Sequence, residues 1–311
     1  MGEDISLHGI IDIGSNTIRL AIYAIRGDQV DMLMKKKHTV GLASYLQDGV
    51  MQQAGIDKAV EILGEYRSFL ESFRIGNVTA FTTAALRNAK NSREAVGEIE
   101  ARVGFPIQVI SGDEEAELDF IGALHGLSED SGIMADIGGG STEIVCFHQR
   151  KIAKKVSLPM GSLMFHSRYS KDILPDEKEC EVMAREARKV LSGASEFHDV
   201  SHGRICGIGG TFKGAVALHN AMFSIGSENK RMGVDRMREI IRRFQRDLGT
   251  EDIALLMKTV PERMHTLLPG LVIAEVLATH FGSDTILYSD SGMREGYIYD
   301  RILQNTYPRG K

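Results

Sequence analysis

One segment of the sequence places three glycines between two carboxylates. It reads Asp136, Ile137, Gly138, Gly139, Gly140, Ser141, Thr142 and Glu143. Successive glycines let the backbone curl so that neighbouring N–H groups point into one concavity that binds anions, and the two hydroxyls can add donors. Carboxylates beside such a concavity suit Mg²⁺ or Mn²⁺, because Mg²⁺ is commonly held by one or two carboxylates, waters and phosphate oxygens. A tight glycine hairpin with a capping Asp has the same spacing, so spacing alone leaves both interpretations open.

A related segment lies near the start of the chain. Asp12, Ile13, Gly14, Ser15 and Asn16 place an acid, a glycine and two polar side chains at the end of an apolar run. These groups can bind a phosphate, although an Asp-Gly turn in a hairpin explains them equally well. If the two segments face each other across a cleft, they form a two-sided phosphate clamp.

Four carboxylates occur within five positions after Ser111 and Gly112: Asp113, Glu114, Glu115 and Glu117. Part of this pattern is structural, because Ser111 with Glu114 fits a helix capping box and acidic residues suit the positive end of a helix. The number of acids exceeds what capping needs, and their mutual repulsion should raise at least one pKa. Such a carboxylate could accept a proton from an attacking water. The residues alone do not select which one.

Cationic residues occur at three places that a polyanion could use. Arg87 follows a predicted strand, at the end where ligand sites of α/β proteins gather, and Arg suits bidentate contact with phosphate. Arg19 interrupts an apolar strand, and an arginine at such a position is hard to explain as a solvated residue. The run Lys35, Lys36, Lys37 and His38 is typical of a solvated face but could attract a polyanion.

A second glycine-rich turn, from Gly207 to Thr211, follows a predicted strand and contains Gly209 and Gly210. It lacks the third glycine of the dinucleotide-binding fingerprint, and the sequence contains no GxxxxGK[ST], HExxH or GxSxG pattern. These observations exclude a P-loop enzyme.

Composition limits the class of protein. The chain has 311 residues, of which 43% are hydrophobic and 25% charged, and its formal net charge is -5. This length suits two domains, and this charge offers no general attraction to nucleic acid or to an anionic membrane, so neither is an expected partner. The three cysteines have no CxxC spacing, and no apolar run is long enough to span a membrane. A cytoplasmic location is expected.

Strand-like and helix-like patterns alternate in both halves of the chain. In the first half they predict strands at residues 9–14, 18–25, 30–34, 78–81 and 107–110, and helices at 55–73, through the 90s and at 113–124. In the second half they predict strands at 133–138, 143–147, 152–158 and 285–289, and helices at 176–191, 237–248 and 271–281. Asp-Ile-Gly opens a strand–turn–strand unit in each half. The pattern predicts two α/β domains of one topology, residues 1–126 and 127–311, with a final helix at about 300–311 that packs back on the first domain.

Seven segments, in this order, resemble the motifs of exopolyphosphatases and guanosine pentaphosphate phosphohydrolases, the Ppx/GppA family. They are Asp12–Asn16, Thr82–Asn88, Ile110–Glu115, Asp136–Glu143, Gly207–Thr211, Leu268–Gly270 and Ser289–Gly296. The resemblance implies the actin-like fold of acetate kinase, sugar kinases and actin, with two ribonuclease-H-like domains and an active site in the cleft between them. It also implies a hydrolase that removes the terminal phosphate of inorganic polyphosphate, of pppGpp, or of both.

The resemblance implies roles for particular residues. Glu115 would be the catalytic base, and Arg87 would act beside it on the transferred phosphate. Asp136 and Glu143 would hold Mg²⁺ or Mn²⁺. Together with the donors described above, the predicted phosphate-binding residues are Asp12, Gly14, Ser15, Asn16, Arg19, Gly138, Gly139, Gly140, Ser141, Thr142, Gly209 and Gly210. Polyphosphate or guanosine penta- or tetraphosphate would be the ligand, and a homodimer is left open.

The sequence departs from the family pattern in two places. Val40–Tyr45 replaces an Arg-Leu-Gly stretch after the first hairpin, and the helical domains that longer members add after the equivalent of Gly296–Asp300 have no counterpart before Lys311. We therefore expect a preference for short polyphosphate or pppGpp.

Two alternative functions use the same residues. The first is a kinase or ATPase of the actin-like fold that binds adenosine at Gly207–Thr211. The second is a non-catalytic sensor of pppGpp or polyphosphate. Glu115 argues against the sensor, because a pure binder gains nothing from an anion beside a polyanion.

Overall fold

The chain folds into two compact units. The computed structural model describes residues 5–127 and 129–304; one unit extends through Ser111 and the other begins at Gly112. Most of the final helix predicted at about 300–311 lies outside the described residues, because the description ends at residue 304. Among the described residues near this end of the chain, Ile298–Ile302 form a short π-helical segment.

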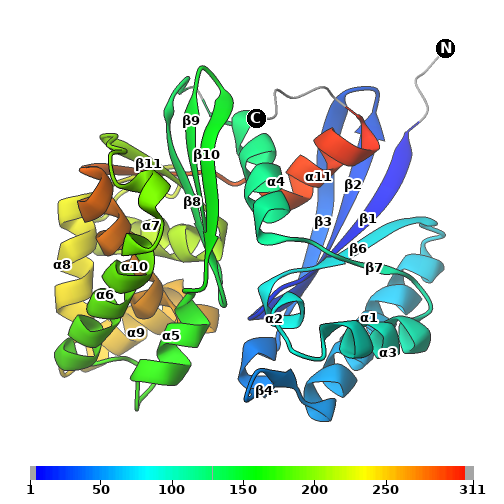
Figure 1. Cartoon of the computed structure of the whole chain (residues 1–311), viewed down its shortest axis with the longest axis horizontal. Helices are drawn as coiled ribbons and strands as arrows, with labels where there is room; N and C mark the ends of the chain where they lie inside the picture. Colours follow the sequence, from blue (N-terminus) through cyan, green and yellow to red (C-terminus); the bar gives the residue numbers. More distant parts are fainter. Residues whose placement is uncertain (1–4, 128, 305–311) are drawn as a thin grey trace. The chain divides into compact units, whose positions relative to one another are not determined.

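The first unit is a five-stranded mixed sheet with α1 and α3 (Figure 1). Its strands are β1 (Ser6–Ile13), β2 (Thr17–Arg26), β3 (Gln29–Thr39), β6 (Asn77–Thr82) and β7 (Ile107–Val109), in the order β3-β2-β1-β6-β7. Its helices are α1 (Gln53–Ser72), α2 (Ala84–Arg87) and α3 (Ser92–Val103), and a small hairpin, β4 (Leu46–Gln47) and β5 (Val50–Met51), precedes α1. Alternate strand residues such as Ile11 and Leu20 pack with Leu63 of α1 in one core, because a strand turns every second side chain to the same face.

The parallel strands of the first unit end at one edge of its sheet. β1 and β2 pair antiparallel, whereas β6 runs parallel to β1 and β7 parallel to β6. In this register Ile13 lies beside Thr82, which lies beside Val109. The loops after β1, β6 and β7 therefore leave the sheet together, at the edge where α/β proteins bind ligands.

The second unit repeats this topology. Its strands are β8 (Gly132–Ile137), β9 (Thr142–His148), β10 (Lys151–Leu158), β11 (Arg204–Ile208), β12 (Arg231–Gly233) and β13 (Thr285–Tyr288), in the order β10-β9-β8-β11-β13-β12. Its helices are α4 (Gly112–Leu124), α5 (Ser162–Tyr169), α6 (Glu177–Ser192), α7 (Gly209–Met222), α8 (Val234–Phe244), α9 (Thr250–Thr259), α10 (Leu267–Phe281) and α11 (Met293–Tyr297). The order and directions of its first five strands match those of β3-β2-β1-β6-β7, which confirms the predicted duplication.

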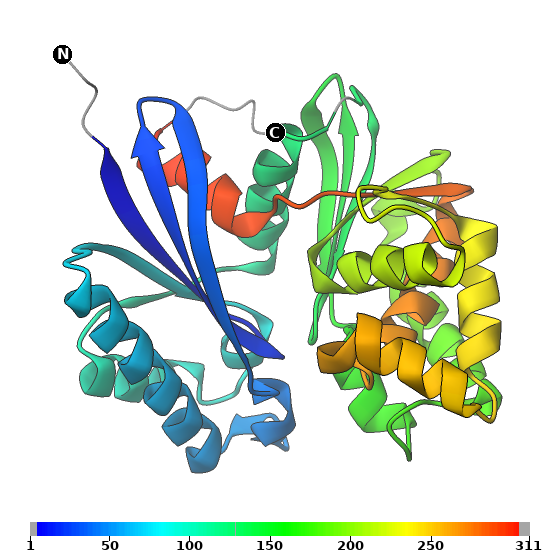
Figure 2. The same ribbon diagram turned by 180° about the vertical axis from the view of Figure 1, so that it is seen from behind.

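α4 and α11 pack backbone against backbone, as both ribbon views show (Figure 1, Figure 2). A Cβ added to Gly122 would lie 2.0 Å from the Gly292 carbonyl oxygen, and one added to Gly296 would lie 1.8 Å from the Leu118 carbonyl oxygen. Only glycine permits this approach. The Gly292 N–H donates to Glu295 at 3.0 Å, which caps the start of α11.

The compact units divide at Ser111 and Gly112, whereas the sequence places the domain boundary between residues 126 and 127. The physical reason is the packing of α4, which contacts β9, β10 and α11. The polar connector that suggested the boundary is a loop inside the second unit, between α4 and β8. Residue 128 of this connector lies outside the described residues.

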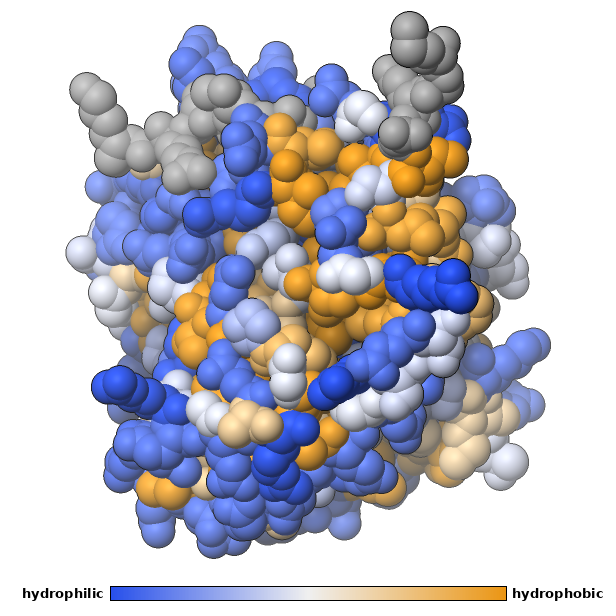
Figure 3. All heavy atoms as spheres, turned by 90° about the vertical axis from the view of Figure 1, so that its right-hand side faces the viewer, coloured by the Kyte–Doolittle hydropathy of each residue, from blue (hydrophilic) through white to orange (hydrophobic). Residues whose placement is uncertain are grey.

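Apolar side chains gather on the upper part of one face of the molecule, above a more polar region (Figure 3). Among the described residues of the first unit, the exposed large apolar side chains are Ile5, Met32, Leu33, Phe73 and Val109. The predicted homodimer stays a prediction.

Within the part of the chain that the structure describes, no helix has the length and apolar character needed to cross a membrane.

Candidate functional site

The turn between β8 and β9 is held in place through its carbonyl groups. The Gly138 N–H donates to the Ser141 carbonyl at 2.9 Å and closes the turn. The Gly138 carbonyl accepts from the N–H and the hydroxyl of Ser162, at 2.8 and 3.0 Å, and the Gly139 carbonyl accepts from the Met164 N–H at 2.9 Å. Ser162 and Met164 lie in the first turn of α5, whose N–H groups have no partner within the helix. The start of α5 therefore fixes the glycine turn.

The N–H groups of Gly139 and Gly140 point away from α5. In a planar trans peptide an N–H points opposite to the carbonyl of the preceding residue, and the carbonyls of Gly138 and Gly139 point at α5. Neither N–H has a protein acceptor among the described residues, and both glycines are partly exposed. The turn thus presents two adjacent donors, as an anion-binding nest does. The Thr142 hydroxyl is used internally, since it donates to the Met160 carbonyl at 2.7 Å.

Asp136 and Glu143 lie directly opposite each other in the β8–β9 pair. Glu143 is buried (1% exposed) and accepts a hydrogen bond from the Ser157 hydroxyl at 2.7 Å. Like charges on directly opposite strand residues destabilise a sheet. The structure therefore places the two predicted metal-binding carboxylates opposite each other, and their binding of a metal ion stays a prediction.

Three acids at the start of α4 lie beside cations of the second unit. Lys155 on β10 contacts Glu117 at 2.5 Å and Asp113 at 3.8 Å. Arg301 contacts Glu114 at 3.0 Å. These pairs give the three acids a structural role on the helix surface.

Glu115 belongs to a different group, which we call the carboxylate cluster: Glu115, Asp119, Asp136 and Glu143. Asp119 is buried, and its pKa is raised well above the usual range, first by burial and then by the charges of Asp136, Glu115 and Glu143. The raised pKa thus belongs to Asp119, a residue that the sequence analysis missed, and burial is its first cause. The available signal was its place on α4, four residues after Glu115 and thus on the same helix face.

Two glycines at the start of α7, directly after β11, lie against charged side chains. Gly209 has φ 76°, and a Cβ there would lie 2.4 Å from Oδ1 of Asp136. A Cβ on Gly210 would lie 1.6 Å from the guanidinium of Arg263. The structure thus places both predicted residues beside charged groups, a carboxylate of the cluster and an arginine. Arg263 was missed too, because nothing in its local sequence points to Gly210.

In the first unit, Asp12 and Arg19 form an ion pair. They lie opposite each other in the β1–β2 register, and an Arg19 guanidinium nitrogen lies 3.2 Å from Oδ2 of Asp12. The Asp12 side chain is 8% exposed and that of Arg19 is 32% exposed. Arg19 therefore interrupts its apolar strand in order to neutralise a buried carboxylate, and part of its guanidinium stays accessible.

The loop after β1 is held by the segment that departs from the family pattern. The Asn16 carbonyl accepts from the N–H groups of Val40 and Gly41, both at 2.9 Å, and the Ser15 carbonyl accepts from Ala43 at 3.0 Å. Ser15 is buried, and Oδ1 of Asn16 is buried with no hydrogen-bond partner among the described residues. Val40–Tyr45 thus positions this loop through its backbone. The Gly14 N–H closes the turn and is not available to a ligand, since it donates to the Thr17 carbonyl at 3.0 Å.

Arg87 ends α2 at the same sheet edge. Its guanidinium donates to the Ile110 carbonyl at 3.2 Å, and its side chain is half-buried. This bond ties the loop after β6 to the loop after β7. Asp12, Asn16, Arg19 and Arg87 therefore lie on loops and strand ends at one edge of the first unit's sheet.

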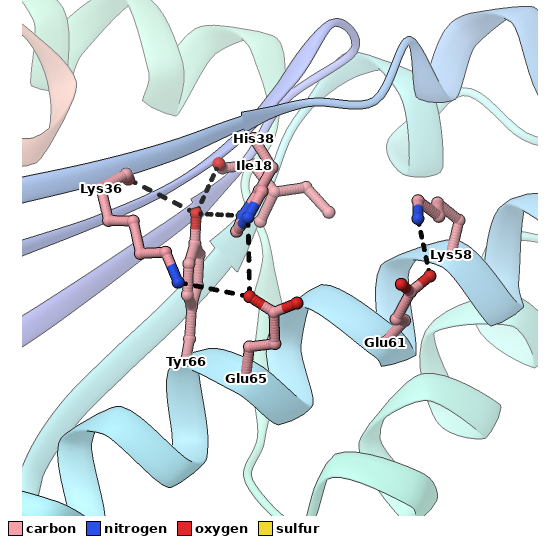
Figure 4. Close-up of polar contacts among 7 residues, drawn as sticks. All are labelled: Ile18, Lys36, His38, Lys58, Glu61, Glu65 and Tyr66. Atoms are coloured by element: carbon pink, nitrogen blue, oxygen red, sulfur yellow. Dashed lines mark hydrogen bonds and ion pairs between the residues drawn. The ribbon is translucent and has the colours of Figure 1, made fainter.

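The basic run on β3 is partly neutralised by α1 (Figure 4). Lys36 contacts Glu65 at 3.2 Å, and a His38 ring nitrogen lies 3.6 Å from the same carboxylate. The Tyr66 hydroxyl donates to the Ile18 carbonyl at 2.9 Å and lies 3.1 Å from the other His38 ring nitrogen. Lys36 and His38 thus have a structural role that the sequence did not show.

Comparison with known proteins identifies relatives over nearly the whole chain. The family described as the Ppx/GppA phosphatase family matches residues 21–305. The crystal structure of an Aquifex aeolicus member of the Ppx/GppA protein family is 25% identical, with a TM-score of 0.78, over 98% of this chain and 100% of that chain. An exopolyphosphatase from Cytophaga hutchinsonii is 22% identical, with a TM-score of 0.83, over 97% of this chain and 99% of that chain. The predicted α/β actin-like fold with two sheet domains is confirmed.

Proposed function

We propose, for a chain that belongs to the Ppx/GppA phosphatase family, hydrolysis of the terminal phosphoanhydride bond of inorganic polyphosphate, of pppGpp, or of both. Membership makes the protein a phosphate hydrolase; the substrate and the roles of individual residues are proposals. The observation that supports them best is the carboxylate cluster, in which Glu115, Asp136 and Glu143 all act electrostatically on buried Asp119.

Glu115 accepts the proton of the attacking water. Its neighbours Asp113, Glu114 and Glu117 contact cations on the helix surface, and Glu115 acts on buried Asp119 together with Asp136 and Glu143. A carboxylate beside the two residues that would hold the ion can accept the proton of an attacking water. This is the physical reason for choosing Glu115.

The transferred phosphate is bound by backbone N–H groups and arginines. The two N–H groups of Gly139 and Gly140 bind its oxygens, and donors placed in advance are worth more where charge develops in the transition state. Arg263, which lies against Gly210, offers a guanidinium beside the start of α7. In the first unit, Arg87 and Arg19 are the proposed phosphate-binding arginines, because a guanidinium suits bidentate contact with phosphate oxygens.

A divalent cation fits the donors present, although no three His, Cys, Asp or Glu side chains in the described part of the chain are arranged to hold one by themselves. Asp136 and Glu143 would hold Mg²⁺ or Mn²⁺ through carboxylate oxygens, with waters and substrate phosphates completing the coordination. When bound, the ion would neutralise charge on the phosphoryl oxygens. Polyphosphate and pppGpp share the terminal phosphoanhydride that these groups would recognise.

A panel of substrates tests the proposal. Phosphate release is measured from short polyphosphate, long polyphosphate, pppGpp and ATP, each with Mg²⁺, with Mn²⁺ and with a chelator. We expect release from polyphosphate or pppGpp that requires the ion. Turnover of ATP alone would favour the kinase or ATPase alternative, and tight binding without turnover of any substrate would favour the sensor.

A matched pair of variants tests the role of Glu115. Glu115→Gln should lower turnover by about 10²–10⁴-fold, the range for losing a general base, with little change in substrate binding. Glu114→Gln, which removes the neighbouring charge beside Arg301, is the control and should keep most of the activity. A reversed result would show that Glu114 is the base.

A further inference from the structure

Asp119 carries a buried oxygen that has no partner. It lies on α4, and one carboxylate oxygen accepts the N–H of Met293 at the start of α11. Its Oδ2 has no hydrogen-bond partner among the described residues. A buried carboxylate oxygen without a partner is costly, and native structures keep few of them without a functional reason.

Capping α11 does not explain this carboxylate. Accepting the Met293 N–H takes one oxygen, which the side-chain carbonyl of Asn would provide without a charge. Asp119 lies on α4, which packs against β8 and β9, the strands that carry Asp136 and Glu143, and these two carboxylates and Glu115 act on it electrostatically. Asp119 therefore adds a fourth acidic group where three are already gathered.

Two cations of the second unit contact the exposed acids of this helix. Lys155 contacts Glu117 and Asp113, and Arg301 contacts Glu114 and Asp300. These ion pairs involve the exposed acids of α4 and not Asp119, whose buried Oδ2 has no partner among the described residues. Such a group favours a bound cation, because opposite charges attract more strongly where water is excluded.

We propose that Asp119 is a positioning residue for the divalent cation that Asp136 and Glu143 would hold, with its Oδ2 accepting a hydrogen bond from a water bound to that ion. Contact through water agrees with the lack of a ready-made three-ligand site in the described residues and with the waters that Mg²⁺ commonly keeps. The inference depends on one part of the proposed function, namely that a divalent cation is the cofactor of this protein.

Mn²⁺ binding without substrate tests the inference. Free Mn²⁺ is measured by electron paramagnetic resonance during titration of the wild type, of Asp119→Asn and of Asp113→Asn. Asn keeps the acceptor for Met293, so the fold should survive. Outer partners of metal sites typically change affinity by about 10–100-fold, and we expect a loss of that size for Asp119→Asn. Asp113→Asn removes an equal charge from an exposed position on the same helix and should leave affinity unchanged.

Unchanged Mn²⁺ affinity in Asp119→Asn would overturn the inference and leave Asp119 as a helix cap. If that variant does not fold, Asp119→Ala provides the same measurement. Because substrate is absent, the two proposals can fail separately. Mn²⁺ binding that depends on Asp119 would stand even if no phosphoanhydride were hydrolysed, and metal-dependent hydrolysis would stand even if Asp119 had no effect on the ion.

Discussion

The two units place different residues at one position of the same hairpin. In the first unit Asp12 at the end of β1 lies opposite Arg19, and in the second unit Asp136 at the end of β8 lies opposite Glu143. The first pair is an ion pair at 3.2 Å. The second brings two carboxylates together, with Asp119 beside them.

The two hairpins therefore differ in charge. The buried acid of the first faces a cation, whereas the acid of the second faces another acid. The first neutralises its buried acid within the sheet, so it can bind a phosphate without a metal ion. The second accumulates negative charge beside a turn that presents two N–H donors. Metal-assisted chemistry on the second unit stays a proposal, and this pair of facing carboxylates is the feature that supports it.

Among changes to the two hairpins, the largest effect is expected when one of the two facing carboxylates of the second hairpin is neutralised. Glu143→Gln keeps the shape and the acceptor for Ser157 but removes one of the two facing charges. We expect phosphate release to fall by about 10–100-fold or more, with a higher Mg²⁺ requirement, because the ion loses a ligand. A Mg²⁺ titration of the rate measures this. Ser157→Ala, which keeps the charge, should have a much smaller effect, and equal losses in both variants would contradict the comparison.

An intermediate effect is expected when the first hairpin loses the cation that faces its buried acid. Arg19→Met keeps the apolar stem but leaves buried Asp12 without its cation. The free energy of unfolding should fall by about 1–3 kcal/mol, the usual cost of an unsatisfied buried polar group. Urea unfolding measures it.

The double variant Asp12→Asn with Arg19→Met is the control for this pair, and it should recover much of the loss. In metal-free protein, Glu143→Gln should change stability in the opposite direction, as a gain. A loss of stability in that variant would show that the two facing acids do not repel each other appreciably.

The smallest expected effect is a change in how stability depends on pH. The pKa of Asp119 is raised in the folded protein, so its protonation stabilises the folded state. This stabilisation is fully present below the unfolded pKa of about 4 and is lost as pH rises through the folded pKa. In chelator, the wild type should lose thermal stability with rising pH more than Asp119→Asn does. Melting temperatures of both proteins across a pH series test this, and parallel curves would contradict it.

Much of the fold could be predicted from the sequence, because strand periodicity and turn residues are local signals. The hairpins around Asp12 and Asp136 and the long helices were found within a few residues of their observed bounds. α5, α7 and α9 were not predicted. α5 has only eight residues, and α7 begins at Gly209 within the glycine-rich turn that was considered as a ligand-binding loop. α9 follows a polar stretch after α8, so its helical period is not marked.

The candidate site was harder, because its charges are balanced by distant partners. The sequence shows the acids of α4 but not that Lys155 and Arg301 engage three of them. Asp119 lies within an apolar helical run, where an isolated acid is easily overlooked. Arg263 meets Gly210 only through tertiary packing, for which no local pattern exists.

The glycine contact between α4 and α11 also has a consequence for the order in which the molecule is assembled. The ribosome makes the helix that carries Glu115 and Asp119 early, but the residues that its glycine face fits, Gly292 and Gly296, emerge much later. Until then Asp119 has no Met293 N–H to accept and α4 has no partner on that face. The nascent chain can therefore pack α4 against β8, β9 and β10 first, and the glycine face of α4 is covered only once α11 has been made.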